Sequence, residues 1–160
     1  MDGTDFRIFN KKENKEGDFY SHKFNAPALR YEIASCIQTG SIVWINGPFN
    51  PGKFNDLQIF RSGLKEKLLE AGEKAEADAG YRGETLVVRH PDMFVSQSDN
   101  KAKKKSRLRH ETINRRIKQF NCMSSVYRHN REKHHLIFQA VAVITQISFE
   151  SGESPFQVHY

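Results

Sequence analysis

LRYEIASCIQTGSIVWI, residues 29–45, decides the fold. In its first half Leu29, Tyr31, Ile33 and the small Ser35 alternate with other residues, which is the period of a strand with one buried face. Gly40 interrupts the chain, and residues 41–45 (SIVWI) are again β-branched and aromatic. Strands joined by a short turn are antiparallel neighbours. The stretch therefore predicts two strands of an antiparallel sheet.

The residues before this stretch add a third strand to the predicted sheet. Residues 6–9 (FRIF) alternate in the same way, and residues 10–18 (NKKENKEGD) are polar and predict a turn or loop. We therefore expect an antiparallel meander of three short strands at the start of the chain.

The residues after it predict a mixture of helices and short strands. A loop rich in Gly and Pro at 47–56 precedes a helix to about residue 69, which Asn55 or Asp56 would cap. Its apolar face consists of Leu57, Phe60, Leu64 and Leu68. Short strands are expected near 74–78 and 85–89.

The last third of the chain is predicted to be a loop and two helices. Residues 96–105 (SQSDNKAKKK) predict a polar loop, and a helix is expected over 106–120. A final helix over about 134–150 is apolar around most of its circumference and should be buried. No segment suggests a second core, so the fold class is α/β or α+β in one domain spanning 1–160.

The composition indicates a globular protein with a charged surface. The formal charge is +6, which suits a polyanionic partner but also a solvated surface with surplus lysines. Two cysteines cannot form a dense disulfide framework and suit a reducing compartment. No uninterrupted apolar run is long enough to predict a transmembrane helix, so no membrane partner is expected.

Three carboxylates occupy places in this outline where metal ligands could converge. Asp2 belongs to the first strand, Asp78 follows it by 76 residues at a strand end before Gly80, and Glu111 lies 33 residues later on a helix. Two Mg²⁺ or Mn²⁺ ions held by such oxygens neutralise the attacking and leaving oxygens in phosphodiester cleavage. The carboxylates therefore predict two-metal chemistry on nucleic acid.

Glu111 has a plainer interpretation as well. It points away from the apolar side of its helix, which carries Ile113, Ile117 and Phe120, and it could pair with Arg115 four residues later on a solvated face. Asp56 is an alternative metal ligand, although a helix cap is the interpretation favoured for it. Asp5 is expected at the surface.

A basic stretch leads into the helix that carries Glu111. Residues 101–109 (KAKKKSRLR) would contact DNA phosphates with salt-sensitive affinity, or form a solvated loop, and they also resemble a nuclear-localisation patch. The candidate DNA-binding residues are Lys103, Lys104, Lys105, Arg107, Arg109 and Lys118.

Four motifs occur in an order that resembles the DDE superfamily endonuclease domain of Harbinger-like and related insertion-sequence transposases. They are DGTDFRI at 2–8, GPFNPGKFNDLQIFR at 47–61, EADAGYRG at 76–83 and RHETINRRIKQF at 109–120. The resemblance implies a ribonuclease-H-like fold in which Asp2, Asp78 and Glu111 are catalytic and bind Mg²⁺ or Mn²⁺. It also implies DNA as the partner, namely transposon ends and target DNA.

Two departures from that family are visible in the chain. The first strand of the family begins several residues before its Asp, whereas only Met1 precedes Asp2 here, so half of a central strand is expected to be missing. The N-terminal DNA-binding region usual in the family is also absent, so a homodimer or a separate DNA-binding protein is expected as a further partner. The expected location is nuclear in a eukaryote and otherwise cytoplasmic.

Two other functions follow from these departures. In the first, the chain is an inactive domesticated or decayed transposase fragment that binds DNA or protein and needs no metal. Alternatively, it would not fold stably alone, and a broad thermal melt would show that.

Overall fold

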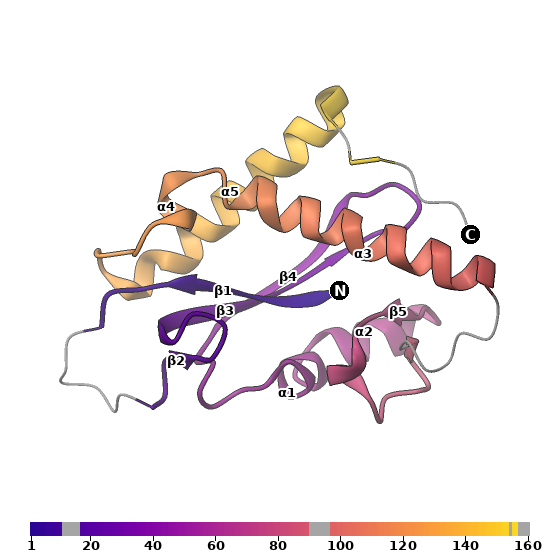
Figure 1. Cartoon of the computed structure of the whole chain (residues 1–160), viewed down its shortest axis with the longest axis horizontal. Helices are drawn as coiled ribbons and strands as arrows, with labels where there is room; N and C mark the ends of the chain where they lie inside the picture. Colours follow the sequence, from indigo (N-terminus) through magenta and orange to yellow (C-terminus); the bar gives the residue numbers. More distant parts are fainter. Residues whose placement is uncertain (11–16, 90–96, 154, 157–160) are drawn as a thin grey trace.

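The computed structural model describes residues 1–10, 17–89, 97–153 and 155–156, and the fold is a mixed α/β arrangement with an antiparallel sheet (Figure 1). The strands are β1 (Asp2–Arg7), β2 (Tyr20–Ser21), β3 (Ala26–Ser35), β4 (Ile42–Phe49), β5 (Ala75–Glu76) and β6 (Val88–Arg89). The helices are α1 (Asp56–Arg61), α2 (Leu64–Ala71), α3 (Gln97–Ile117), α4 (Asn121–Ser124) and α5 (His134–Ser148). Short helical turns cover Ala79–Tyr81, Arg131–Lys133 and Phe149–Glu153.

The predicted antiparallel meander is confirmed, with β3 in the middle. β1, β2 and β4 all pair antiparallel with β3. All six residues of β1 have partners on β3, from Asp2 opposite Ile33 to Arg7 opposite Ala28. The first strand is therefore fully paired on this side. Most of the polar stretch at 10–18 lies outside the described residues.

The other edge of β1 is covered by two segments that are distant in sequence. At its start, the Met1 amino group donates to the Glu76 carbonyl oxygen at 2.9 Å, which joins β1 to β5. Beyond its end, Ile8 forms a parallel bridge with Tyr127, whose amide donates to the Arg7 carbonyl. β1 thus lies between β3 and these segments. β5 and β6 pair parallel and are two residues each, shorter than the predicted 74–78 and 85–89.

The predicted helix over 56–69 is in fact two helices. α1 ends at Arg61, and the Ser62 amide donates to the Gln58 and Ile59 carbonyl oxygens. Gly63 follows with an extended φ of −158° and precedes α2. A Cβ on Gly63 would lie 3.0 Å from the Trp44 ring, so the close approach to β4 favours glycine at the break.

The predicted loop over 96–105 is wrong, because α3 begins at Gln97 and continues to Ile117. Lys, Ala, Gln and Arg are good helix formers, and no Gly or Pro interrupts this range. The lysines that suggested a mobile loop are therefore spread around a helix. That helix crosses the sheet alongside α5 in Figure 1.

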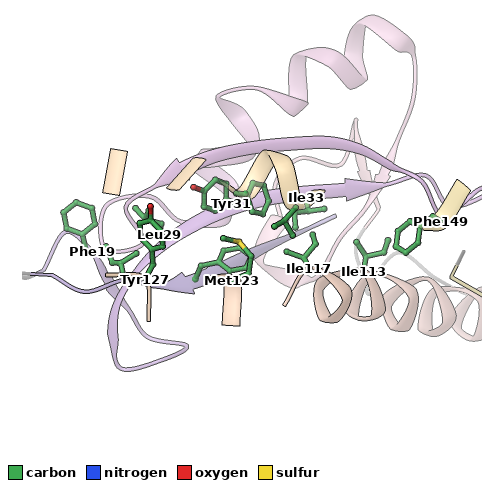
Figure 2. Close-up of a cluster of buried hydrophobic side chains, with 13 residues drawn as sticks. Phe19, Leu29, Tyr31, Ile33, Ile113, Ile117, Met123, Tyr127 and Phe149 are labelled. Atoms are coloured by element: carbon green, nitrogen blue, oxygen red, sulfur yellow. The ribbon is translucent and has the colours of Figure 1, made fainter. Parts of the chain in front are cut away.

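Buried side chains form two clusters, one on each face of the sheet. The main cluster packs α3 and α5 against Phe6, Leu29, Tyr31 and Ile33 (Figure 2). In the second cluster Phe60, Leu64, Leu68, Tyr81 and Val88 pack with Ala34. Alternation along β3 sends Ile33 to one face and Ala34 to the other. The sheet is therefore covered on both faces.

α5 is buried along one side only. Its inward residues include His134, Phe138, Val141 and Thr145, and the His134 Nδ1 atom lies 2.8 Å from the Tyr31 hydroxyl. Its opposite side exposes several large apolar side chains. The expectation of a helix buried around its circumference is wrong, because nothing among the described residues packs on that outer side.

Candidate active site

A cavity of about 850 Å³ opens between the start of β1, the second cluster and α3. Asp2 of β1 lines it, together with Asp78 from the segment after β5 and Glu111 from α3. Apolar residues that include Trp44 and Leu68 form much of the wall, and charged side chains from β1, the segment after β5 and α3 also line it. The three carboxylates predicted from sequence therefore share one cavity although they are far apart in the chain.

Asp2 and Asp78 both line the cavity and are near enough for their charges to interact. Burial raises the pKa of Asp2, the nearby Lys23 ammonium opposes that rise, and the charges of Asp56 and Asp78 add to it. Asp78 follows β5 and caps the turn at 79–81, where its side chain accepts a 2.8 Å hydrogen bond from the Gly80 amide. A cation between Asp2 and Asp78 would relieve their repulsion.

Tyr81 is a buried side chain near several of these carboxylates. Its hydroxyl is buried and has no hydrogen-bond partner among the described residues. Burial raises the pKa of Tyr81, and the charges of Asp56, Glu32, Asp2 and Asp78 raise it further. Four carboxylates from four different segments therefore lie near enough to act on one phenol.

Glu111 lines the cavity from α3 and is paired with a neighbour. Its side chain is 57% exposed, and its Oε1 atom lies 3.2 Å from the Arg107 Nε atom. The predicted partner Arg115 is not the one used. In the described part of the chain, no three His, Cys, Asp or Glu side chains are close enough to hold a metal ion as they stand. Glu111 would have to leave Arg107 to join Asp2 and Asp78.

Asp56 serves neither as the helix cap nor as a cavity residue. Asn55 caps α1, accepting from the Gln58 amide while the Gln58 side chain accepts from the Asn55 amide. The Asp56 carboxylate instead lies 3.2 Å from Arg30 Nη1 and contacts Gly3, where any Cβ would overlap it. Asp56 therefore helps to hold α1 against the sheet.

Asp5, expected at the surface, is in fact buried. It accepts from Arg30 Nε at 2.7 Å, from Arg30 Nη2 at 3.0 Å and from the Ser21 hydroxyl at 2.6 Å. The register places Asp5 directly opposite Arg30, so both side chains leave the sheet on the same face. The alternation of residues 6–9 gave no sign of this ion pair, which together with Ser21 joins β1, β3 and β2.

His110 is a cavity residue that the sequence analysis did not identify. Only 7% of it is exposed, and neither ring nitrogen has a hydrogen-bond partner among the described residues. Burial and, to a smaller extent, the nearby Met1 amino group lower its pKa to about 3. His110 precedes Ile113 by three positions, which places both on the inward side of α3. This spacing could have predicted that His110 is buried.

The predicted DNA-binding residues have different environments. Lys104 and Lys105 are exposed on α3, Arg107 pairs with Glu111, and Lys103 lines the cavity. Lys118 is half-buried, with its ammonium 5.4 Å from the Phe6 ring centre and 5.7 Å from that of Phe24.

Arg109 is not available to DNA, which corrects its assignment. It is 1% exposed, and its guanidinium donates to the carbonyl oxygens of Phe156 at 2.8 Å and Ile37 at 2.5 Å. A side chain that bonds two segments in this way has a structural role.

Comparison of the chain with protein-family models, with curated proteins and with solved structures gives no match in any of the three. Among the described residues, no helix combines the length and apolar character that a membrane crossing requires. The functional assignment therefore rests on the residues and their geometry.

Proposed function

We propose that the chain is a DDE-type transposase-derived endonuclease domain that cleaves or joins DNA phosphodiesters with two divalent metal ions. The observation that carries this proposal is the cavity shared by Asp2, Asp78 and Glu111. If these acids were only surface charges, there would be no reason for β1, the turn after β5 and α3 to place them in the same cavity.

The fold supports a ribonuclease-H-like assignment. Three antiparallel strands open the chain, and β1 lies centrally, because β3 pairs on one side and Met1 bonds to Glu76 of β5 on the other. Helices cover both faces of the sheet. A central first strand that carries Asp2 is the arrangement implied by the resemblance to DDE transposases.

The donor set fits Mg²⁺ or Mn²⁺. Carboxylate oxygens are the ligands that hard cations prefer, and Asp2, Asp78 and Glu111 would hold the ions. When bound, two such ions activate the attacking oxygen and stabilise the leaving oxygen of an in-line displacement. The exposed Arg107–Glu111 pair is worth only about 0.3–0.5 kcal/mol, so Glu111 can leave it at small cost.

The basic residues would then hold the DNA beside the cavity. Lys104 and Lys105 are exposed on the helix that carries Glu111, and Arg107 becomes available to phosphates once Glu111 turns to metal. Such contacts give affinity that falls steeply with salt and carries no sequence preference.

Plasmid nicking with Mn²⁺ tests the proposal. Asp78→Asn and Glu111→Gln should each abolish nicking while the folded protein still binds DNA, and a chelator should stop the unmodified chain. Glu66→Gln is the matched control, because Glu66 is exposed on α2 and does not line the cavity. Equal nicking by all variants would remove the cavity as the active site.

A second function is favoured by the exposed cations of α3 and the charge of +6. In this alternative the chain binds DNA without cutting it. Salt-sensitive DNA binding that needs no metal, with no nicking by the unmodified chain, would establish this function instead.

A further inference from the structure

The outer side of α5 carries an apolar stripe that nothing among the described residues covers. Leu136 and Val143 are each 56% exposed, Ile147 is 54% exposed, and Ala140 is also exposed. Their spacing of four, three and four residues follows one seam of a helix. We call Leu136, Ala140, Val143 and Ile147 the α5 stripe. No Asp, Glu, Lys or Arg interrupts it, because α5 contains none.

Charged residues stand at the two ends of this seam. Lys133 precedes Leu136 by three positions, and Glu150 follows Ile147 by three, so both continue the heptad spacing. Both are exposed. The sequence of the seam is therefore a cation, four apolar residues and an anion.

Lys133 lies in the turn just before α5 and Glu150 in the helical turn just after it, so each is at the end of α5 that is unfavourable for its charge. The N-terminus of a helix is electropositive and its C-terminus electronegative, so Lys133 and Glu150 both oppose the dipole of α5. An antiparallel partner helix reverses this, because it brings its C-terminus beside the N-terminus of the first.

The seam is also complementary to itself under a two-fold rotation. The pairs Lys133 with Glu150, Leu136 with Ile147, and Ala140 with Val143 all share one midpoint, between residues 141 and 142. A two-fold axis at this point would place each residue opposite its pair on a second copy. It would form two Lys133–Glu150 ion pairs around an apolar centre, where the small Ala140 lets the helices approach.

We propose that this stripe is a homodimer interface in which α5 packs antiparallel against α5 of a second copy. The interface is two-fold and isologous, as in most homodimers. The stripe is short compared with the roughly 800 Å² per partner of a standard interface, so the dissociation constant should be micromolar. The proposal does not depend on the nuclease function.

Sedimentation equilibrium of the full chain over the micromolar range tests the interface. The chain should pass from monomer to dimer, and Val143→Glu should stay monomeric with an unchanged thermal melt, because Val143 is exposed. Leu86→Glu is the matched control, since Leu86 is 79% exposed just before β6 and should not affect dimerisation. A monomer at every concentration, or a Val143→Glu dimer, overturns the proposal.

Charge exchange tests the pairing at the ends. Lys133→Glu and Glu150→Lys should each weaken dimerisation by about tenfold, as expected for two exposed ion pairs, and the double variant should restore it. If the double variant is as weak as the two single variants combined, the residues do not face each other.

Cysteine cross-linking tests the orientation in a background that carries Cys36→Ser and Cys122→Ser. Lys133→Cys together with Glu150→Cys should give a disulfide-linked dimer under oxidising conditions. Lys133→Cys alone should not, because its two copies would lie about 26 Å apart at a rise of 1.5 Å per residue. Efficient cross-linking of Lys133→Cys alone indicates parallel helices and refutes the antiparallel dimer.

Discussion

Replacing Glu32 with Gln should stabilise the protein at neutral and higher pH but not in acid. Glu32 is 1% exposed on β3, and its Oε2 atom accepts a 2.9 Å hydrogen bond from the Trp44 indole. Its Oε1 atom has no partner among the described residues. Burial raises the pKa of Glu32 to about 7 from an ordinary value of 4.5, which the Trp44 hydrogen bond only partly opposes.

The size and direction of the effect follow from this pKa. Between pH 4.5 and about 7 the folded state holds a proton that the unfolded state has lost, so the free energy of unfolding falls as pH rises. Each pKa unit corresponds to 1.36 kcal/mol, so ionised Glu32 costs about 3 kcal/mol above pH 7. Below 4.5 both states are protonated and the cost disappears.

Urea unfolding followed by circular dichroism measures this difference. Glu32→Gln keeps an oxygen for Trp44 but never ionises, and its unpaired amide should cost about 1 kcal/mol at every pH. Its stability relative to the unmodified protein should therefore rise by about 3 kcal/mol between about pH 4 and about pH 8. Glu66→Gln, on the exposed side of α2, should show no such rise. A difference independent of pH would refute the argument that Glu32 is buried with a raised pKa.

Three further perturbations test the rest of the structure. Arg30→Met leaves Asp5 buried without its cation and should destabilise the fold by about 3–5 kcal/mol in urea, and adding Asp5→Leu should recover most of the loss. Ile117→Ala should cost about 2–5 kcal/mol, since Ile117 is fully buried at the end of α3; loss of less than about 1 kcal/mol would contradict that packing. Burial lowers the pKa of His134 to about 4, so the unmodified protein gains stability as pH rises from 4 to 6.5, and His134→Asn should remove about 3 kcal/mol of that gain.

The strands of the meander could be predicted because their side chains alternate. Leu29, Tyr31 and Ile33 face the main cluster, as the period of two indicates. The buried Asp5 could not be predicted in this way, because its burial depends on the register that sets it opposite Arg30. Register over such a distance is decided by the whole sheet, and a local pattern does not contain it.

The candidate site was predicted in part. Asp2, Asp78 and Glu111 were named from sequence and line one cavity. His110 was missed because a histidine on an apolar face gives no sign that its nitrogens will lack partners. Arg109 was misassigned because a run of basic residues does not indicate which of them turns inward when the run is helical.

The attachment of α3 determines how the cavity can change shape. Ile113 and Ile117 are fully buried, and Arg109 bonds to Ile37 and Phe156, so the backbone on both sides of Glu111 is fixed. Movement of the Glu111 carboxylate relative to this backbone is therefore a rotation of its exposed side chain. Exposed side chains change rotamer within picoseconds to nanoseconds, far faster than a hinge opens. Any adjustment of this wall to a bound group would consequently need no slow backbone motion.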